Sequence, residues 1–239
     1  MNWQVPRMWE DGDVWILGGG PSLTCQFDIP EHVVQKVMRG ESSPSEYSPY
    51  MEAIHQKHVI GINVAYLIGD WIDMMFFGDN KFFQIHKERL AAWPGLKVTC
   101  HTIGQKYPWV KYLAQDKSHI RGISPNPKMV SWNANSGSAA ISVAANAGAS
   151  RIILVGFDMS LNNSGNQHWH TLYRNMPTAA PPKGKQRDGG RKPQATFTRH
   201  LLGFPEIAAD AKRRGIEIIN VCPTSAITVF PKFTLKELL

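Results

Sequence analysis

Short apolar runs alternate with polar stretches along the whole chain, and each run has the length of a strand that is buried on both faces. Several of the stretches between them end in helix stop signals: Pro94 follows one, and Gly148 and Gly215 follow two others. This alternation predicts an α/β fold with a Rossmann-like, doubly wound and mainly parallel sheet. The expected strands span 13–17, 58–63, 74–77, 96–100, 151–156 and 216–221, and the expected helices span 31–38, 81–92, 136–147 and 205–214.

The chain length favours a single domain over residues 1–239. A chain of 239 residues, of which 43% are hydrophobic, can bury one large core. Residues 28–57 are interpreted as an insertion, because a Ser- and Pro-rich stretch follows their one helix. Residues 160–198 have many Gly and Pro residues and no sustained period, which predicts a long lid loop.

The composition argues against several classes of protein. Charged residues make up 19% of the chain and aromatic residues 10%, which is not the composition of a disordered chain. The three cysteines are far apart and form no CxxC pair, which disfavours a disulfide scaffold or a structural zinc site and favours a reducing compartment. No apolar run reaches the roughly 18 residues of a membrane span, and no signal-peptide pattern opens the sequence. We therefore expect a cytoplasmic protein without a membrane span.

The positive charge is concentrated in one segment. The formal net charge is +7, and residues 160–200 hold seven Lys and Arg residues but one acidic residue. A basic loop predicts an anionic partner, such as nucleotide phosphates or nucleic acid, although a solvated loop without a partner has the same composition. The candidate lid and acceptor-binding residues are Tyr173, Arg174, Lys185 and Arg191.

Polar residues follow most of the expected strands. In open α/β sheets ligands bind at the carboxyl ends of the strands, so these residues predict a binding crevice. The glycine turn at residues 18–22 has no complete cofactor motif. Leu23 stands where GxGxxG needs its third glycine, and no Gly-Lys-Ser/Thr follows as in a Walker A loop. The candidate nucleotide-binding residues are Gly19, Gly20, Pro21, Ser22, Asn63, Asp79, Asn80, Ser136 and Gly137.

Each of these features also has a structural interpretation. The first glycine turn brings a backbone close to a phosphate, or it is only a tight turn between strand and helix. Ser136 is expected to cap a helix, to expose amides to an anion, or both. Asp158 could ligate a divalent ion or a ribose hydroxyl, or it could be a turn residue. Trp169 could stack a base or sugar or belong to the core.

His200 is the candidate general base, because it lies between the predicted lid and the following helix. A histidine can take a proton from a hydroxyl group near neutral pH.

Several motifs occur together in the order found in one enzyme family. The segment 16–23, with Gly18-Gly19-Gly20-Pro21-Ser22-Leu23, resembles the opening strand and GxGPSL turn of the bacterial sialyltransferases, the family 42 glycosyltransferases. Gly61-Ile62-Asn63, the segment 76–83, the segment 135–138, Gly156-Phe157-Asp158 and the segment 221–225 are similar to further motifs of that family. The resemblance implies a nucleotide-sugar-binding α/β fold with a mobile lid, and it places His200 where the family has its catalytic histidine. Asp79 stands where the family has an asparagine.

The chain also resembles the archaeal 6-hydroxymethylpterin diphosphokinase-like domain. The shared features are the GxGPSL start, a strand that ends in an acid like Asp79, and a GxDL…H pattern like Gly156-Phe157-Asp158 with His168. This second resemblance implies diphosphate transfer from ATP with magnesium, and it adds His168 and Asp158 to the catalytic candidates.

Three functions follow as hypotheses. The first is a glycosyltransferase-like enzyme with a nucleotide-sugar donor, a histidine base and no required cofactor or metal, modifying a glycan or nucleic acid in a bacterial or phage-infected cell. The second is a magnesium-dependent pyrophosphokinase-type transferase that holds the metal on Asp79 and Asp158. The third is a nucleotide- or nucleic-acid-binding module without catalysis.

Overall fold

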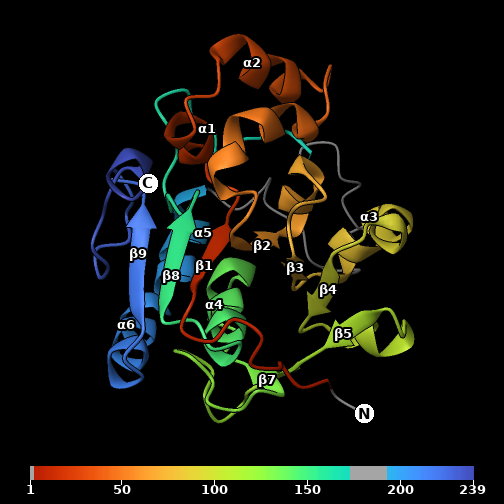
Figure 1. The fold of residues 1–239 in the computed structure, drawn as a ribbon, viewed down its shortest axis with the longest axis vertical. Coiled ribbons are helices and arrows are strands. Elements are labelled where there is room, and N and C mark those ends of the chain that lie inside the picture. Colours follow the sequence, from red (N-terminus) through yellow and green to blue (C-terminus); the bar gives the residue numbers. More distant parts are fainter. Residues whose placement is uncertain (1–2, 173–192) are drawn as a thin grey trace, which may run out of the picture.

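The computed structural model describes residues 3–172 and 193–239, and it is built around one parallel sheet of seven strands (Figure 1). Every neighbouring pair in this sheet is parallel. The strand order is β5-β4-β3-β2-β1-β8-β9, which confirms the predicted Rossmann-like α/β fold. The strands are β1 (Asp13–Leu17), β2 (His58–Ile62), β3 (Met74–Phe77), β4 (Leu96–Thr99), β5 (Val110–Tyr112), β8 (Arg151–Val155) and β9 (Glu217–Val221).

Helices cover both faces of the sheet, because the strands are apolar on both sides. In β1, Val14 and Ile16 pack into one buried cluster, whereas Trp15 and Leu17 pack into the other. The first cluster includes α4 (Ser136–Asn146) and α6 (Phe204–Arg213). The second includes α1 (Ser22–Gln26), α2 (Glu31–Arg39), α3 (Asn80–Ala92) and the 3-10 helices η1 (Pro44–Ile54) and η2 (Asn63–Ile68).

Helix α4 places its first turn at the carboxyl end of the central strands. Every residue of α4 is buried, and the helix lies against β1, β2, β3 and β8 (Figure 1). Its Ala, Ser and Gly side chains are small, which lets the helix approach the sheet closely. No helix in the described ranges is long and apolar enough to cross a membrane.

Residues 28–57 form α2 and η1, which pack on the same side of the sheet as α3. The segment interpreted as an insertion therefore supplies part of the layer that covers this face.

Several elements differ from the sequence-based expectation. Strand β5 was not predicted, because its three residues at the sheet edge include the half-exposed Lys111 and Tyr112 and give no apolar run. The two-residue strands β6 (Ala114–Gln115) and β7 (Met129–Val130) are too short for a pattern. The 3-10 helices η3 (Thr102–Lys106) and η4 (Leu235–Glu237), of five and three residues, were not predicted either.

The predicted lid, 160–198, ends too late. Helix α5 (Pro193–Leu201) begins inside it, with Pro193 at its first position, where the missing N–H costs no hydrogen bond. His200 therefore lies in the last turn of α5, and it still precedes α6, the helix that was predicted over 205–214. Most of the basic stretch, residues 173–192, lies outside the described residues.

Candidate functional site

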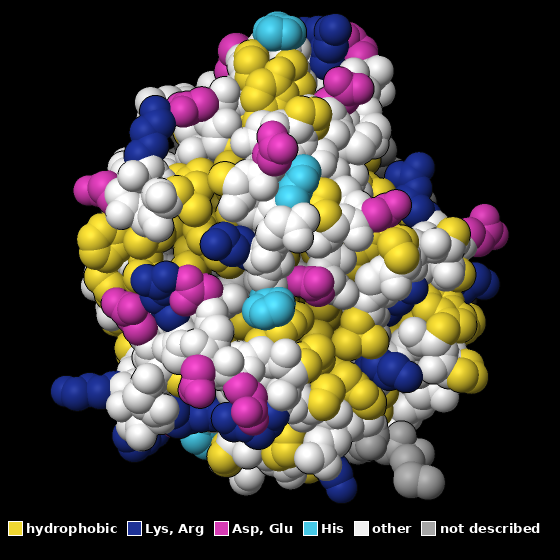
Figure 2. Space-filling model, viewed as in Figure 1, with side chains coloured by type: hydrophobic (Ala, Val, Ile, Leu, Met, Phe, Trp, Pro, Cys, Tyr) yellow, Lys and Arg dark blue, Asp and Glu magenta, His cyan; other side chains and the backbone are white. Residues whose placement is uncertain are grey.

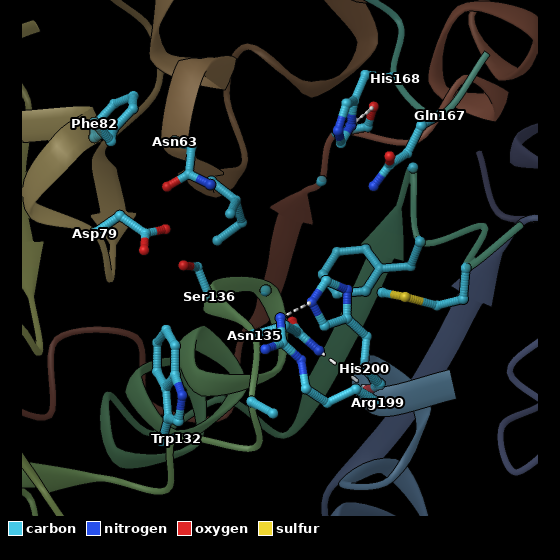
Figure 3. A pocket seen from close by; sticks show the side chains of 18 of the residues that line it. Asn63, Asp79, Phe82, Trp132, Asn135, Ser136, Gln167, His168, Arg199 and His200 are labelled. Atoms are coloured by element: carbon cyan, nitrogen blue, oxygen red, sulfur yellow. Dashed lines mark hydrogen bonds between the residues drawn. The ribbon is translucent and has the colours of Figure 1, made fainter. Parts of the chain in front are cut away.

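A cavity of about 420 Å³ opens at the carboxyl ends of the central strands (Figure 3). Its position beside β1 and β8 is the point where the strand order reverses, which is where α/β sheets of this type bind ligands. Its volume is within the range of small-molecule sites. It is lined by Gly18, Gly19, Ile62, Asn63, Asp79, Lys81, Phe82, Trp132, Ala134, Asn135, Ser136, Gly137, Gly156, Phe157, Met159, Gln167, His168, Arg199 and His200.

The glycine turn after β1 packs tightly against the end of β8. A Cβ atom on Gly18 would lie 2.5 Å from the carbonyl oxygen of Gly156, and one on Gly20 would lie 2.6 Å from the same oxygen. The Gly20 N–H donates to that oxygen at 2.8 Å. Gly18 and Gly20 are therefore required by strand packing, and of the three glycines Gly18 and Gly19 line the cavity.

The carboxylate of Asp158 accepts hydrogen bonds from the end of the glycine turn and does not line the cavity. One carboxylate oxygen accepts from the Ser22 N–H at 3.0 Å, and the other accepts from the Ser22 hydroxyl at 2.7 Å. Burial raises the pKa of Asp158, and the bonds from Ser22 oppose this rise. Of the predicted residues that the structure describes, Gly20, Pro21, Ser22, Asn80 and Asp158 are absent from the lining of this cavity.

Asn63 presents an unsatisfied acceptor at the cavity. It follows β2 directly and has a left-handed backbone, with φ of 52°. Its side-chain oxygen is buried and has no hydrogen-bond partner among the described residues. A buried acceptor that lines a cavity can take its donor from a bound ligand or from an ordered water.

The first turn of α4 lies in the middle of the cavity. Its N-cap is Asn135, whose side-chain oxygen accepts from the Ser138 N–H at 2.8 Å, so the expectation that Ser136 is the cap was wrong. Asn135 also donates from Nδ2 to the carbonyl oxygen of His200 at 3.2 Å. Ser136 and Gly137 line the cavity as the first residues of the helix, where backbone N–H groups attract anions.

Two histidines face the cavity from its other end (Figure 3). The Nδ1 atom of His168 lies 3.2 Å from the carbonyl oxygen of Gly19; since a carbonyl only accepts, Nδ1 carries the proton. His200 Nε2 lies 3.4 Å from the guanidinium of Arg199. Burial is the main cause that lowers the pKa of each histidine to about 4, and Arg199 lowers that of His200 further. Both imidazoles are therefore neutral at pH 7.

The remaining predicted residues lie in different places. Asp79 lines the cavity, whereas Asn80 begins α3 and accepts from Gln84 at 3.1 Å. Trp169 is a core residue: it is 1% exposed and donates to the Gly18 carbonyl oxygen at 2.9 Å. The predicted lid residues lie outside the described residues; they are Tyr173, Arg174, Lys185 and Arg191.

Sequence reasoning missed several lining residues. Asn135 had a signal, because Asn immediately before Ser-Gly-Ser is a favoured N-cap. Arg199 belonged to the basic stretch without being singled out. Phe82 and Trp132 had no signal, because aromatic residues next to apolar runs are usually core.

The buried histidines predict acid sensitivity of the fold. The pKa values of His86, His168 and His200 are lowered to about 4, and that of His170 to about 2, mainly by burial. In the unfolded chain these groups titrate near about 6.5, so below that pH the unfolded state binds more protons than the folded state. Stability is then lost as the pH falls from about 6.5 towards 4. Each histidine contributes about 1.4 kcal/mol per pH unit at most.

The measurement is the melting temperature between pH 7.5 and 5, a range above the ordinary carboxylate titrations. His170→Phe is expected to flatten the slope, whereas His32→Gln, a control on the outer part of α2, is expected to leave it unchanged. A melting temperature that is constant over this range would contradict the prediction.

Comparison with known proteins supports the fold. No protein-family model matches the chain, and no curated protein matches it. Among solved structures, the chain is similar to the MAf glycosyltransferase from Magnetospirillum magneticum AMB-1, with a TM-score of 0.59 and 12% sequence identity. The match covers 100% of this chain and 36% of that one, so this chain spans about a third of the larger protein's length.

Proposed function

We propose that the chain is a glycosyltransferase-like enzyme that binds a nucleotide-sugar donor in the cavity at the carboxyl ends of β1, β2, β3 and β8. The observation that carries this proposal is that one cavity combines an anion-binding helix start with two histidines. The first turn of α4 lies at its centre, and two neutral imidazoles lie at one end. The fold likeness to a glycosyltransferase supports the same class.

The phosphate of the donor would lie at the start of α4. The N–H groups of Ser136 and Gly137 and the helix dipole attract negative charge there. Arg199 lines the cavity beside Asn135 (Figure 3), and its guanidinium would pair with the same phosphate. These groups would stabilise the charge that develops on the leaving phosphate oxygen, so the proposed reaction requires no metal.

His200 would act as the general base. The acceptor hydroxyl oxygen attacks the anomeric carbon of the sugar, the bond from that carbon to the phosphate oxygen breaks, and the acceptor proton passes to the imidazole. Burial is the main cause that lowers the pKa of His200, and Arg199 lowers it further. A bound phosphate would neutralise Arg199 and remove that second cause, which would raise the pKa and make the imidazole a better base. His168, at the same end of the cavity, is the second candidate for the base.

The magnesium-dependent alternative would need both Asp79 and Asp158 on the metal. Both oxygens of Asp158 accept from Ser22, and Asp79 is the acid of this pair that lines the cavity. The arrangement therefore favours the glycosyltransferase proposal.

The acceptor class is proposed from charge. The net charge of +7 favours an anionic acceptor such as nucleic acid, in a bacterial or phage-infected cell, over a neutral glycan. Figure 2 shows Lys and Arg side chains interspersed with Asp and Glu on one face of the described molecule, so the excess charge does not gather on that face.

A thermal-shift panel of CMP-, UDP- and GDP-sugars and ATP, each with and without magnesium, tests the proposal. A nucleotide sugar is expected to raise the melting temperature without magnesium. Arg199→Gln is expected to weaken that shift, whereas Lys212→Gln, which removes the same charge from the exposed side of α6, is expected to preserve it. A shift with ATP alone that requires magnesium would instead support the pyrophosphokinase alternative.

A further inference from the structure

Asp79 holds a carboxylate that the fold does not use. It occupies the N-cap position of α3, where an aspartate ordinarily accepts from the amides of the first turn, yet its side chain makes no capping hydrogen bond. Among the described residues, no hydrogen bond or ion pair engages this carboxylate. The side chain is exposed and points into the cavity (Figure 3). An acceptor pair aimed into a cavity is suited to a ligand that offers two donors.

The surroundings of Asp79 are aromatic. Figure 3 shows Asp79 between Phe82 and Trp132. The Trp132 ring lies directly on Gly78, since a Cβ atom at Gly78 would overlap the six-membered part of the indole. Phe82 is 3% exposed and stacks on His86, so it forms a fixed apolar surface. The half-buried Trp132 is the ring on which a flat ligand could stack.

The order of groups along the cavity suits a nucleotide whose base lies at this end. Figure 3 shows Asp79 and Trp132 on one side, Ser136 in the centre, and His200 on the other side. With the phosphate at Ser136 and the reacting sugar at His200, the nucleoside extends towards Asp79. The ribose would then lie near Asn63, whose buried oxygen needs a donor such as a hydroxyl group.

We infer that the donor carries guanine and that Asp79 selects it; this inference rests on the proposed function. Guanine presents two adjacent donors, N1–H and the 2-amino group, which match the two oxygens of one carboxylate. Lys81, two residues after Asp79 in the chain, also lines the cavity and would donate to guanine O6. The two carboxylate oxygens of Asp79 and the ammonium group of Lys81 would together pair with the 2-amino group, N1–H and O6 of guanine.

The other bases fit this pair of side chains less well. Cytosine and adenine present one amino group beside an acceptor nitrogen, which would face the second carboxylate oxygen. Uracil presents one N–H between two carbonyl oxygens. Each of these bases would leave a lone pair opposite a negative charge, which is unfavourable in a partly desolvated site.

Isothermal titration with nucleoside mono- and diphosphates of guanine, hypoxanthine, xanthine, cytosine, uracil and adenine tests the inference. Guanine nucleotides are expected to bind at least about 10-fold more tightly than the others, including hypoxanthine, which lacks the 2-amino group. Asp79→Asn is expected to weaken guanine binding by about 10- to 100-fold. The same substitution is expected to improve xanthine binding, because the amide oxygen can accept from xanthine N1–H while the amide nitrogen donates to the neighbouring C2 carbonyl.

Asp70→Asn is the matched control. Asp70 is also exposed, lies outside this cavity and loses the same charge on substitution, so guanine binding is expected to remain unchanged. Tightest binding of a cytosine or uracil nucleotide would overturn the guanine assignment and leave the proposed function standing. Equal weakening of all bases by Asp79→Asn would place the carboxylate on the ribose and also overturn it. If no nucleotide binds the wild-type protein, the proposed function itself fails.

Discussion

Replacing His200 with alanine is expected to lower kcat by about 100- to 10,000-fold, the usual contribution of a positioned general base. The imidazole lines the cavity in the last turn of α5, and its backbone is held by the side chain of Asn135. The proposed base contacts the acceptor and not the donor, so the dissociation constant of the donor should change little. The measurement is nucleotide release from the nucleotide sugar that raises the melting temperature most, alongside titration of the same donor.

Two variants control this experiment. His200→Gln keeps a polar side chain of similar reach but cannot take up a proton, so it should lose activity as His200→Ala does. His32→Ala, on the exposed face of α2, should retain the wild-type rate. Loss of donor affinity in parallel with kcat would assign His200 to donor binding instead. Full activity of His200→Ala combined with an inactive His168→Ala would transfer the role of base to His168.

Replacing Gly20 with alanine is expected to lower the free energy of unfolding by about 3 kcal/mol or more, since overpacking against rigid backbone is costly. The added methyl group would lie 2.6 Å from the carbonyl oxygen of Gly156 and would overlap a carboxylate oxygen of Asp158. Relief by rotation of Asp158 would break both of its bonds to Ser22. The melting temperature should therefore fall by roughly 6–12 °C, the usual conversion for a chain of this size.

Gly12, just before the start of β1, supplies the control. A Cβ atom there would lie 3.5 Å from the carbonyl oxygen of Trp9, which is an ordinary contact, so Gly12→Ala should change stability by less than about 0.5 kcal/mol. Equal melting temperatures for Gly20→Ala and the wild type would show that the contact between the glycine turn and β8 is looser than the structure has it.

Much of the fold could be predicted from the sequence because its central strands are buried on both faces. An apolar run such as Arg151–Val155 marks such a strand without further information. The edge strand β5 has no such run, and its pairing with β4 depends on tertiary contacts. The start of α5 could not be separated from the Gly- and Pro-rich stretch before it.

The candidate site also has a part that the sequence predicts and a part that it does not. Asn63 and Asp79 follow predicted strands, and topology alone places them at one edge of the sheet. Asp158 also follows a predicted strand, yet its carboxylate pairs with Ser22, 136 positions away in the chain. No local pattern reports a contact of that separation. Sequence reasoning can therefore place polar residues at the edge of the sheet, but it cannot tell which of them already have partners.

The amide of Asn135 has a consequence for how this protein can diverge. Its oxygen caps α4 and its nitrogen holds the end of α5, so one side chain sets the spacing between the proposed phosphate position and the proposed base. A substitution of this residue would therefore change donor binding and acceptor activation at the same time. Related chains that use other acceptors are therefore expected to keep this asparagine, together with the start of α4 and the end of α5, and to change other residues of the cavity.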